Sequence, residues 1–238
     1  MRPITIVSQS TKVSPQDLAA LVRALQDQCD KHFSPAWGVY AKLSAIAADP
    51  AVPYDPKGQE VIRLLDHSDQ AGALGYHTDL PSGVPEGFAF VLDTVNDGLP
   101  WQPTVSHELL EQLLDPWCSL CVPAKLPGAF GKDTGKVAVV ALEDADPVED
   151  DVYSIDGVPV SNFVLPAWFT AAGTRYDFLG KLHAPLTLTP GGYISYSTTL
   201  GSWKQITAKE AFSKTSFSRH ARRRRWHAER RKRSRQGT

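Results

Sequence analysis

Apolar residues recur at helical spacing in the N-terminal part of the chain. Five of them share one helical face: Leu18, Leu21, Val22, Leu25 and Cys29. Ser14 is a typical N-cap residue, and Pro15 suits the first helical position because its missing N–H has no partner there in any case. The pattern predicts an amphipathic helix that faces the core and ends near Phe33, broken by Ser34-Pro35.

A second helical stretch runs from Pro103 to Asp115 and stops before Pro116. Its leucines crowd both sides of the predicted helix: Leu109, Leu110, Leu113 and Leu114. An apolar surface of that width predicts a helix buried over most of its circumference. The same helix carries one imidazole and two carboxylates, which need partners because unpaired buried charge is costly.

Short apolar or alternating runs, bounded by Pro, Gly, Asp and Ser, predict strands. The predicted strands are residues 1–8, 36–46, 61–65, 71–77, 88–92 and 137–142. Asp156-Gly157 lies between two further short strands and predicts a hairpin over 153–160. The segments expected to be loops are residues 49–59, 78–87 and 117–136.

Composition places the chain among ordinary globular proteins. It has 238 residues, of which 42% are hydrophobic and 21% are charged, enough for a sizeable core. No apolar run approaches the ~18 residues that cross a bilayer, and the N-terminus predicts no signal peptide. Three cysteines are too few for a disulfide framework, so we expect synthesis in a reducing cytoplasm and take the Cys118-x-x-Cys121 pair as packing residues.

The charge is divided unequally between two parts of the chain. Residues 219–238 hold ten of the 25 Lys and Arg residues and one of the 26 acids. We therefore predict an acidic body over residues 1–212 and an extended basic tail over residues 213–238. The tail residues expected to contact nucleic acid are Arg219, Arg222, Arg223, Arg224, Arg225, Trp226, Arg230, Arg231, Lys232, Arg233 and Arg235. An acidic protein surface is the competing partner for the tail.

The polar residues of the second helix suggest a metal site. His107 and Glu111 lie one helical turn apart on the same face, and Glu108 lies about 100° round the helix. Zincin metallopeptidases use His-Glu-x-x-His, in which two ligands are one turn apart and the glutamate is the general base. Here Glu111 replaces the second histidine, and carboxylates also bind Zn²⁺. The alternative for this short pattern is a salt-linked core helix.

A third zinc ligand has to come from elsewhere in the chain. The acidic stretch over residues 143–151 follows a predicted strand and could supply it. Glu143, at the end of that strand, is the first choice and Asp146 is the second. The alternative for this stretch is a solvated loop.

Several segments in a fixed order resemble a family of tailed-bacteriophage and prophage proteins, which are described as virion structural proteins with a zincin-like signature. The resemblance covers roughly residues 5–200 and leaves out the basic tail. The segments that carry it are AGALGYH (71–77), SHELLE (106–111) followed by Asp115-Pro116, and DPVE (146–149) leading into SNFVLPAWF (161–169). Together these segments are much more specific than any one of them.

The resemblance implies an α+β, zincin-like domain: a mixed sheet whose edge lies over an active-site helix, with an N-terminal backing helix. It implies that His107 and Glu111 are zinc ligands and that Glu108 is the base. It also implies that Tyr76 and His77 line the cleft and stabilise an oxyanion. The alternative for this pair is a packed aromatic ring and a capped turn.

Three functions follow as hypotheses. The first is a bacteriophage virion protein of the head, neck or tail, made in the host cytoplasm. Its body would pack on neighbouring virion subunits in a multi-copy assembly, and its basic tail would bind packaged DNA or a neighbouring subunit. The second is an active zinc-dependent peptidase in virion maturation or host entry; the two are compatible, and the fold could also be a scaffold that has lost its chemistry. The third, a DNA-binding regulator, would rest on the basic tail alone.

Overall fold

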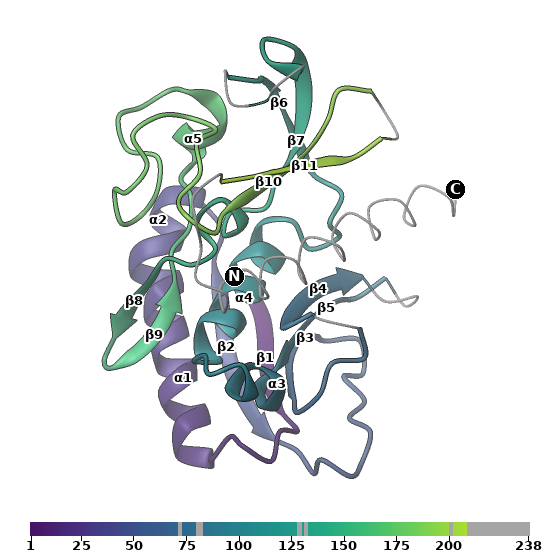
Figure 1. Cartoon of the computed structure of the whole chain (residues 1–238). Coiled ribbons are helices and arrows are strands. Elements are labelled where there is room, and N and C mark those ends of the chain that lie inside the picture. Colours follow the sequence, from purple (N-terminus) through teal and green to yellow (C-terminus); the bar gives the residue numbers. More distant parts are fainter. Residues whose placement is uncertain (71–72, 80–82, 128–129, 131–132, 200–201, 209–238) are drawn as a thin grey trace. The chain divides into compact units, whose positions relative to one another are not determined.

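The computed structural model describes residues 1–70, 73–79, 83–127, 130, 133–199 and 202–208 (Figure 1). The chain forms two compact units. Unit 1 comprises Met1–Cys118 and Val152–Ser161, and unit 2 comprises Ser119–Asp151 and the chain from Asn162 onward. The predicted boundary between body and tail lies outside the described residues, as do all the tail residues expected to bind nucleic acid.

Unit 1 is built on a five-stranded mixed sheet with the strand order β2-β1-β3-β5-β4. Its strands are β1 (Arg2–Ser8), β2 (Ala41–Ala47), β3 (Glu60–Leu65), β4 (Gly75–Asp79) and β5 (Pro85–Phe90). Four of them are parallel, and only the edge strand β4 pairs antiparallel, with β5. Together with the helices described below, this sheet confirms the expected α+β class with a mixed sheet.

Unit 1 contains both of the helices that the hydrophobic pattern predicts. Its helices are α1 (Pro15–Asp27), a π-helical segment η1 (Gln28–Phe33), α2 (Ser34–Trp37), α3 (Val91–Asn96) and α4 (Gln102–Leu114). Ser14 caps α1 as expected, since its Oγ accepts the Asp17 N–H at 3.1 Å. The predicted break at Ser34-Pro35 is wrong. Pro35 lies in the first turn of α2, where no N–H is required, and the chain leaves the helix only at Gly38, which has φ = 72°.

Further boundaries differ from the sequence prediction; for example, the strand expected over residues 71–77 is β4, Gly75–Asp79. The strand expected over residues 36–46 begins only at Ala41, after α2. The strand expected to begin at Phe88 begins at Pro85, and the residues from Val91 form α3 instead of continuing the strand. Residues 117–136, expected to be a loop, contain strand β6 (Cys121–Lys125). Sheet pairing with β7 (Val137–Ala141) stabilises β6 despite its internal proline, which an edge strand tolerates.

The predicted hairpin is confirmed as β8 (Val152–Ile155) and β9 (Val158–Ser161) in unit 1. Asp156 and Gly157 have φ values of 49° and 81°. Positive φ at both turn residues is the requirement of a type I′ hairpin turn, which Asp-Gly meets at low cost. Strand β9 packs against α4.

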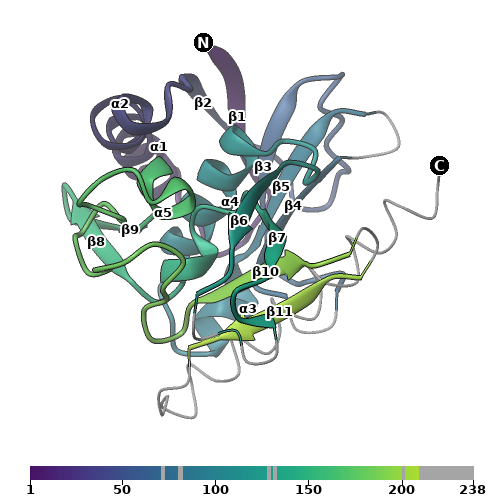
Figure 2. The ribbon, with the colours of Figure 1, turned by 90° about the horizontal axis from the view of Figure 1, so that it is seen from above.

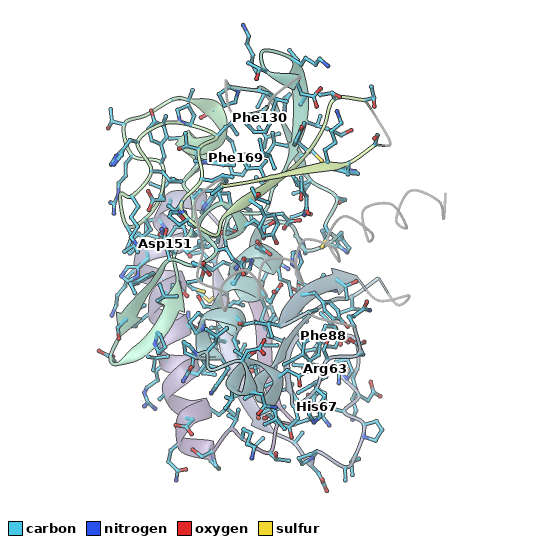
Figure 3. The ribbon with its side chains drawn as sticks, in the orientation of Figure 1. Arg63, His67, Phe88, Phe130, Asp151 and Phe169 are labelled. Carbon is cyan, nitrogen blue, oxygen red and sulfur yellow. The ribbon has the colours of Figure 1, made fainter. Side chains whose placement is uncertain are left out.

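Unit 2 contains an antiparallel four-stranded sheet with the order β11-β10-β7-β6. Its remaining elements are β7 (Val137–Ala141), the 3₁₀ helix η3 (Asp146–Val148), α5 (Pro166–Thr170), β10 (Tyr193–Ser197) and β11 (Lys204–Thr207). Figure 2 shows β10 and β11 running side by side. Phe130 packs edge-on against Tyr196 of β10, with ring centroids 5.1 Å apart (Figure 3).

Asp133, in the loop before β7, forms ion pairs and a hydrogen bond with residues of the unit 2 sheet and of its own loop. Its carboxylate lies 2.8 Å from Nζ of Lys136 and 2.5 Å from Nζ of Lys204, and it accepts the Tyr196 hydroxyl at 3.1 Å. Hydrogen bonds from the two lysines hold the pKa of Asp133 well below its ordinary value.

In the part of the chain that the structure describes, no helix is long and apolar enough to cross a bilayer.

Candidate metal centre in unit 1

Helix α4 packs against strands β4 and β5, and two glycines let it approach them closely. A Cβ atom on Gly75 of β4 would lie 2.6 Å from Cγ2 of Thr104 and 2.8 Å from Oε1 of Glu108. A Cβ atom on Gly87 of β5 would lie 3.1 Å from Oε1 of Gln112. The absence of a side chain at Gly75 therefore lets the polar face of α4 lie against the edge strand β4, and Gly87 leaves room on β5 for Gln112 and for Ile62 of β3.

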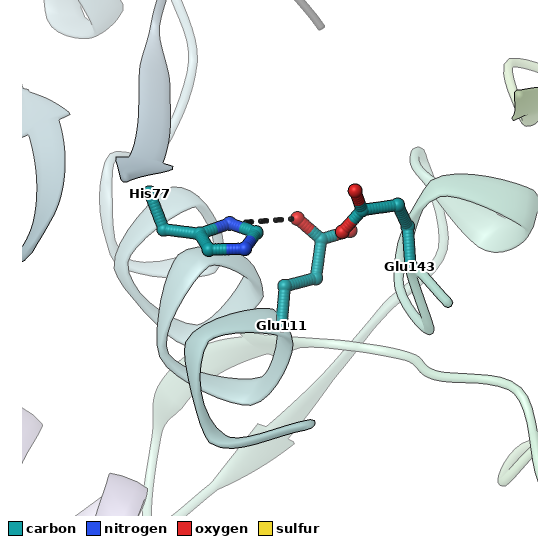
Figure 4. A group of neighbouring side chains, drawn as sticks. All are labelled: His77, Glu111 and Glu143. Carbon is teal, nitrogen blue, oxygen red and sulfur yellow. Dashed lines mark ion pairs between the residues drawn. The ribbon is translucent and has the colours of Figure 1, made fainter. Parts of the chain in front are cut away.

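His77 lies on the same side of β4 as Gly75, because alternate residues of a strand point to the same face. Its Nδ1 atom is 3.6 Å from Oε2 of Glu108 and 3.6 Å from Oε2 of Glu111. Figure 4 shows the imidazole turned toward the Glu111 carboxylate. The other oxygen of Glu111, Oε1, is 2.8 Å from Nε2 of His107, one turn earlier on α4. We call His77, His107, Glu108 and Glu111 the His/Glu cluster.

All members of the His/Glu cluster are buried, with at most 2% of each residue exposed. The Glu111 carboxylate lies between two imidazoles from different elements, β4 and α4. This arrangement departs from the sequence expectation in one respect. His77, expected to line a cleft, sits beside the predicted ligand Glu111.

The second nitrogen of His77 is held by the backbone. Its Nε2 atom is 3.1 Å from the carbonyl oxygen of Asp115, just beyond the end of α4. A carbonyl oxygen can only accept, so Nε2 carries the proton. The nitrogen directed at the two carboxylates is thus Nδ1, which is available for coordination in the neutral ring.

The electrostatics of the cluster favour positive charge at His77. Burial by itself lowers the pKa of this imidazole, but interactions with Cys118, Glu108 and Glu111 outweigh that effect and hold the pKa well above its ordinary value. The carboxylates that favour a proton on Nδ1 also favour a cation at the same place, and histidine ligands bind metal in competition with protons.

The donor set fits zinc by chemistry, and one of its distances, between His77 and Glu111, also fits zinc coordination. Two neutral imidazoles and a carboxylate are among the ligand combinations that Zn²⁺ prefers. Ligand atoms about 2.0–2.1 Å from a tetrahedral zinc lie about 3.3 Å from each other. The distance of 3.6 Å from Nδ1 of His77 to Glu111 exceeds the ordinary range of an N–H···O hydrogen bond and is close to that separation. The distance of 2.8 Å from Nε2 of His107 to Oε1 of Glu111 is within the ordinary range of a hydrogen bond.

A buried hydrogen-bond ring supports the opposite side of α4. The Ser106 hydroxyl donates to Oε1 of Gln28 at 2.7 Å and accepts the Ser161 N–H at 3.0 Å. Nε2 of Gln28 donates to the Ser161 carbonyl at 2.9 Å, which closes the ring. The ring joins η1, α4 and β9 at the residue before His107. Periodicity gave no signal for it, because Gln28 and Ser106 come from distant parts of the chain.

Tyr76 lies on the opposite face of β4 from His77. Its hydroxyl is 3.0 Å from both carboxylate oxygens of Asp69, and its ring packs on Phe88, with centroids 4.7 Å apart, and on Phe90. The structure therefore does not bring Tyr76 into the His/Glu cluster with His77.

The two acids predicted as the third ligand belong to unit 2. Glu143 follows β7, and Asp146 is the first residue of η3; both are buried. Their membership of a ligand set with His107 and Glu111 stays a prediction. Sequence reasoning missed the carbonyl of Asp115, since a backbone acceptor leaves no sequence signal.

Comparison of the chain with protein-family models, with curated proteins and with solved structures finds no match in any of the three.

Proposed function

We propose that unit 1 is a zinc-dependent, zincin-like hydrolase of the metallopeptidase type, with His77, His107 and Glu111 as the zinc ligands. The observation that carries this proposal is the Glu111 carboxylate, whose two oxygens face one imidazole from β4 and one from α4. His77 then takes the place of the second histidine that the His-Glu-x-x-Glu pattern lacks. The antiparallel edge strand over α4 and the N-terminal helix α1 agree with the zincin-like arrangement.

In this proposal three residues of the His/Glu cluster are metal ligands and the fourth is the general base. Bound zinc supplies a Lewis acid that polarises a carbonyl group. His77, His107 and Glu111 would hold the ion, and the Asp115 carbonyl would orient the His77 ring, as outer partners of metal-bound histidines commonly do. Glu108 would accept the proton of the attacking water and deliver it to the leaving amine. Oε2 of Glu108 is 3.6 Å from Nδ1 of His77, and this short distance supports the proposed role of Glu108 as the base.

Zinc content tests the ligand set directly. We expect the purified full-length protein to hold one equivalent of zinc by mass spectrometry. His77→Ala, His107→Ala and Glu111→Ala should each weaken zinc binding by more than about a hundredfold, since loss of an outer partner alone costs about 10- to 100-fold. His183→Ala is the matched control, because His183 is exposed and belongs to unit 2. Absence of zinc from the wild-type protein after zinc addition would refute the proposal.

We propose a bacteriophage virion as the setting of this chemistry. Support comes from the segments that resemble virion proteins, since the first contributes His77 and the second contributes His107, Glu108 and Glu111. The partners in this proposal are other virion subunits in a multi-copy assembly and packaged DNA, contacted by the basic residues from Arg219 onward. If the site no longer catalyses hydrolysis, unit 1 would serve in the virion as a structural scaffold.

Removal of residues 219–238 tests the proposed setting. We expect the truncated protein to fold as the full chain does, because the charged segment adds little apolar surface. Particle assembly or DNA retention should be impaired, and binding of the full chain to duplex DNA should weaken steeply with salt. Normal particles from the truncated protein would argue against a role of the tail in assembly.

A further inference from the structure

The turn that follows α4 contacts His77 at two places. The carbonyl oxygen of Asp115 accepts the Cys118 N–H at 3.0 Å and also accepts Nε2–H of His77 at 3.1 Å. The thiol of Cys118 donates to the carbonyl oxygen of His77, with Sγ and O 3.5 Å apart. This turn thus forms hydrogen bonds with both the ring and the backbone of His77.

Cys118 adopts an unusual backbone conformation in that turn. Its φ is 48°, in the left-handed region that non-glycine residues rarely enter. Such conformations persist where surrounding contacts impose them, and they concentrate at functional sites. Here the contacts are the Cys118 N–H on Asp115 and the thiol on His77, and the residue is only 9% exposed.

We propose that Cys118 is a positioning residue for His77. By fixing the Asp115–Cys118 turn, it holds the Asp115 carbonyl against Nε2–H, so that Nδ1 is the nitrogen directed at Glu108 and Glu111. This inference rests on the proposed zinc site. It assigns to the thiol a role in orienting a ligand, distinct from ligation and from general packing.

Two substitutions at Cys118 separate positioning from folding. Cys118→Gly removes the thiol contact that fixes the turn on the His77 carbonyl but suits φ = 48°, so the protein should still fold without that contact. Cys118→Ser keeps a donor for the His77 carbonyl. Cys121→Ser is the control, because Cys121 belongs to unit 2 and its thiol lies 3.8 Å from the carbonyl oxygen of the nearby Ser119.

The measurements are zinc affinity, by competition with a chelator, and ¹⁵N NMR of the His77 ring in the zinc-loaded protein. In Cys118→Gly we expect zinc affinity to fall about tenfold or more, as for loss of an outer partner, and the fraction of His77 ligated through Nδ1 to fall. Cys118→Ser should retain most of the affinity, and Cys121→Ser should match the wild type. Denaturation of each variant checks that the fold is retained.

Two results would overturn the inference while the zinc site stands. One is a Cys118→Gly protein with wild-type zinc affinity and unchanged His77 ring signals. The other is a thiolate-to-cobalt charge-transfer band in the cobalt-substituted wild type that disappears in Cys118→Ser, which would make Cys118 a ligand. A wild-type protein that binds no zinc would instead remove the proposed function on which the inference rests.

Discussion

Glu108→Gln should reduce peptide hydrolysis by about 10²- to 10⁴-fold, the usual contribution of a general base. The amide has nearly the shape of the carboxylate but cannot accept the proton of the attacking water. Hydrolysis would be measured as product formation from a mixed peptide library, followed by mass spectrometry. Because the proposed zinc ligands are His77, His107 and Glu111 and do not include Glu108, zinc content should stay at one equivalent.

The zinc measurement is what makes this variant informative. Loss of activity with zinc retained supports Glu108 as the base. Loss of activity together with zinc would show that Glu108 is a ligand, and retained activity would exclude it from the reaction. A wild-type protein that binds zinc but cleaves no peptide favours the scaffold alternative.

Gly75→Ala should destabilise unit 1 by about 1–3 kcal/mol, the usual cost of extra volume in a packed site. The added Cβ would lie 2.6 Å from Cγ2 of Thr104, 2.8 Å from Oε1 of Glu108 and 2.8 Å from the backbone oxygen of Phe88. The Phe88 oxygen belongs to the backbone of β5 and cannot yield easily, whereas the other two atoms belong to side chains of α4, so we expect α4 to shift away from β4. Denaturant unfolding measures the loss of stability, and chelator competition should show weaker zinc binding, since His77 and Glu111 move apart.

A second substitution tests the steric cause. Thr104→Ser removes the methyl group closest to the added Cβ, so the Gly75→Ala/Thr104→Ser protein should regain part of the stability that Gly75→Ala loses. The coupling between the two changes, measured in a double-mutant cycle, should be favourable. Additive effects would mean that the contact between β4 and α4 is not the source of the loss.

Local features of the sequence determined several elements correctly. Ser14 and Pro15 define the start of α1, and Asp156-Gly157 defines the β8–β9 turn, because the required backbone conformations are properties of these residues themselves. The spacing of His107 and Glu111 likewise determined that they meet on α4, since helical geometry alone places them one turn apart.

Which residues meet His107 and Glu111 depends on long-range packing. The antiparallel pairing of β4 with β5 aligns His77 with Gly87 and turns the imidazole toward α4, and no local periodicity encodes the register of strands that are distant in sequence. The Asp115 carbonyl and the Cys118 thiol join the cluster by the path of the chain after α4. Local sequence patterns thus predict the helix and the spacing of its polar residues, whereas packing between distant segments brings two imidazoles to one carboxylate.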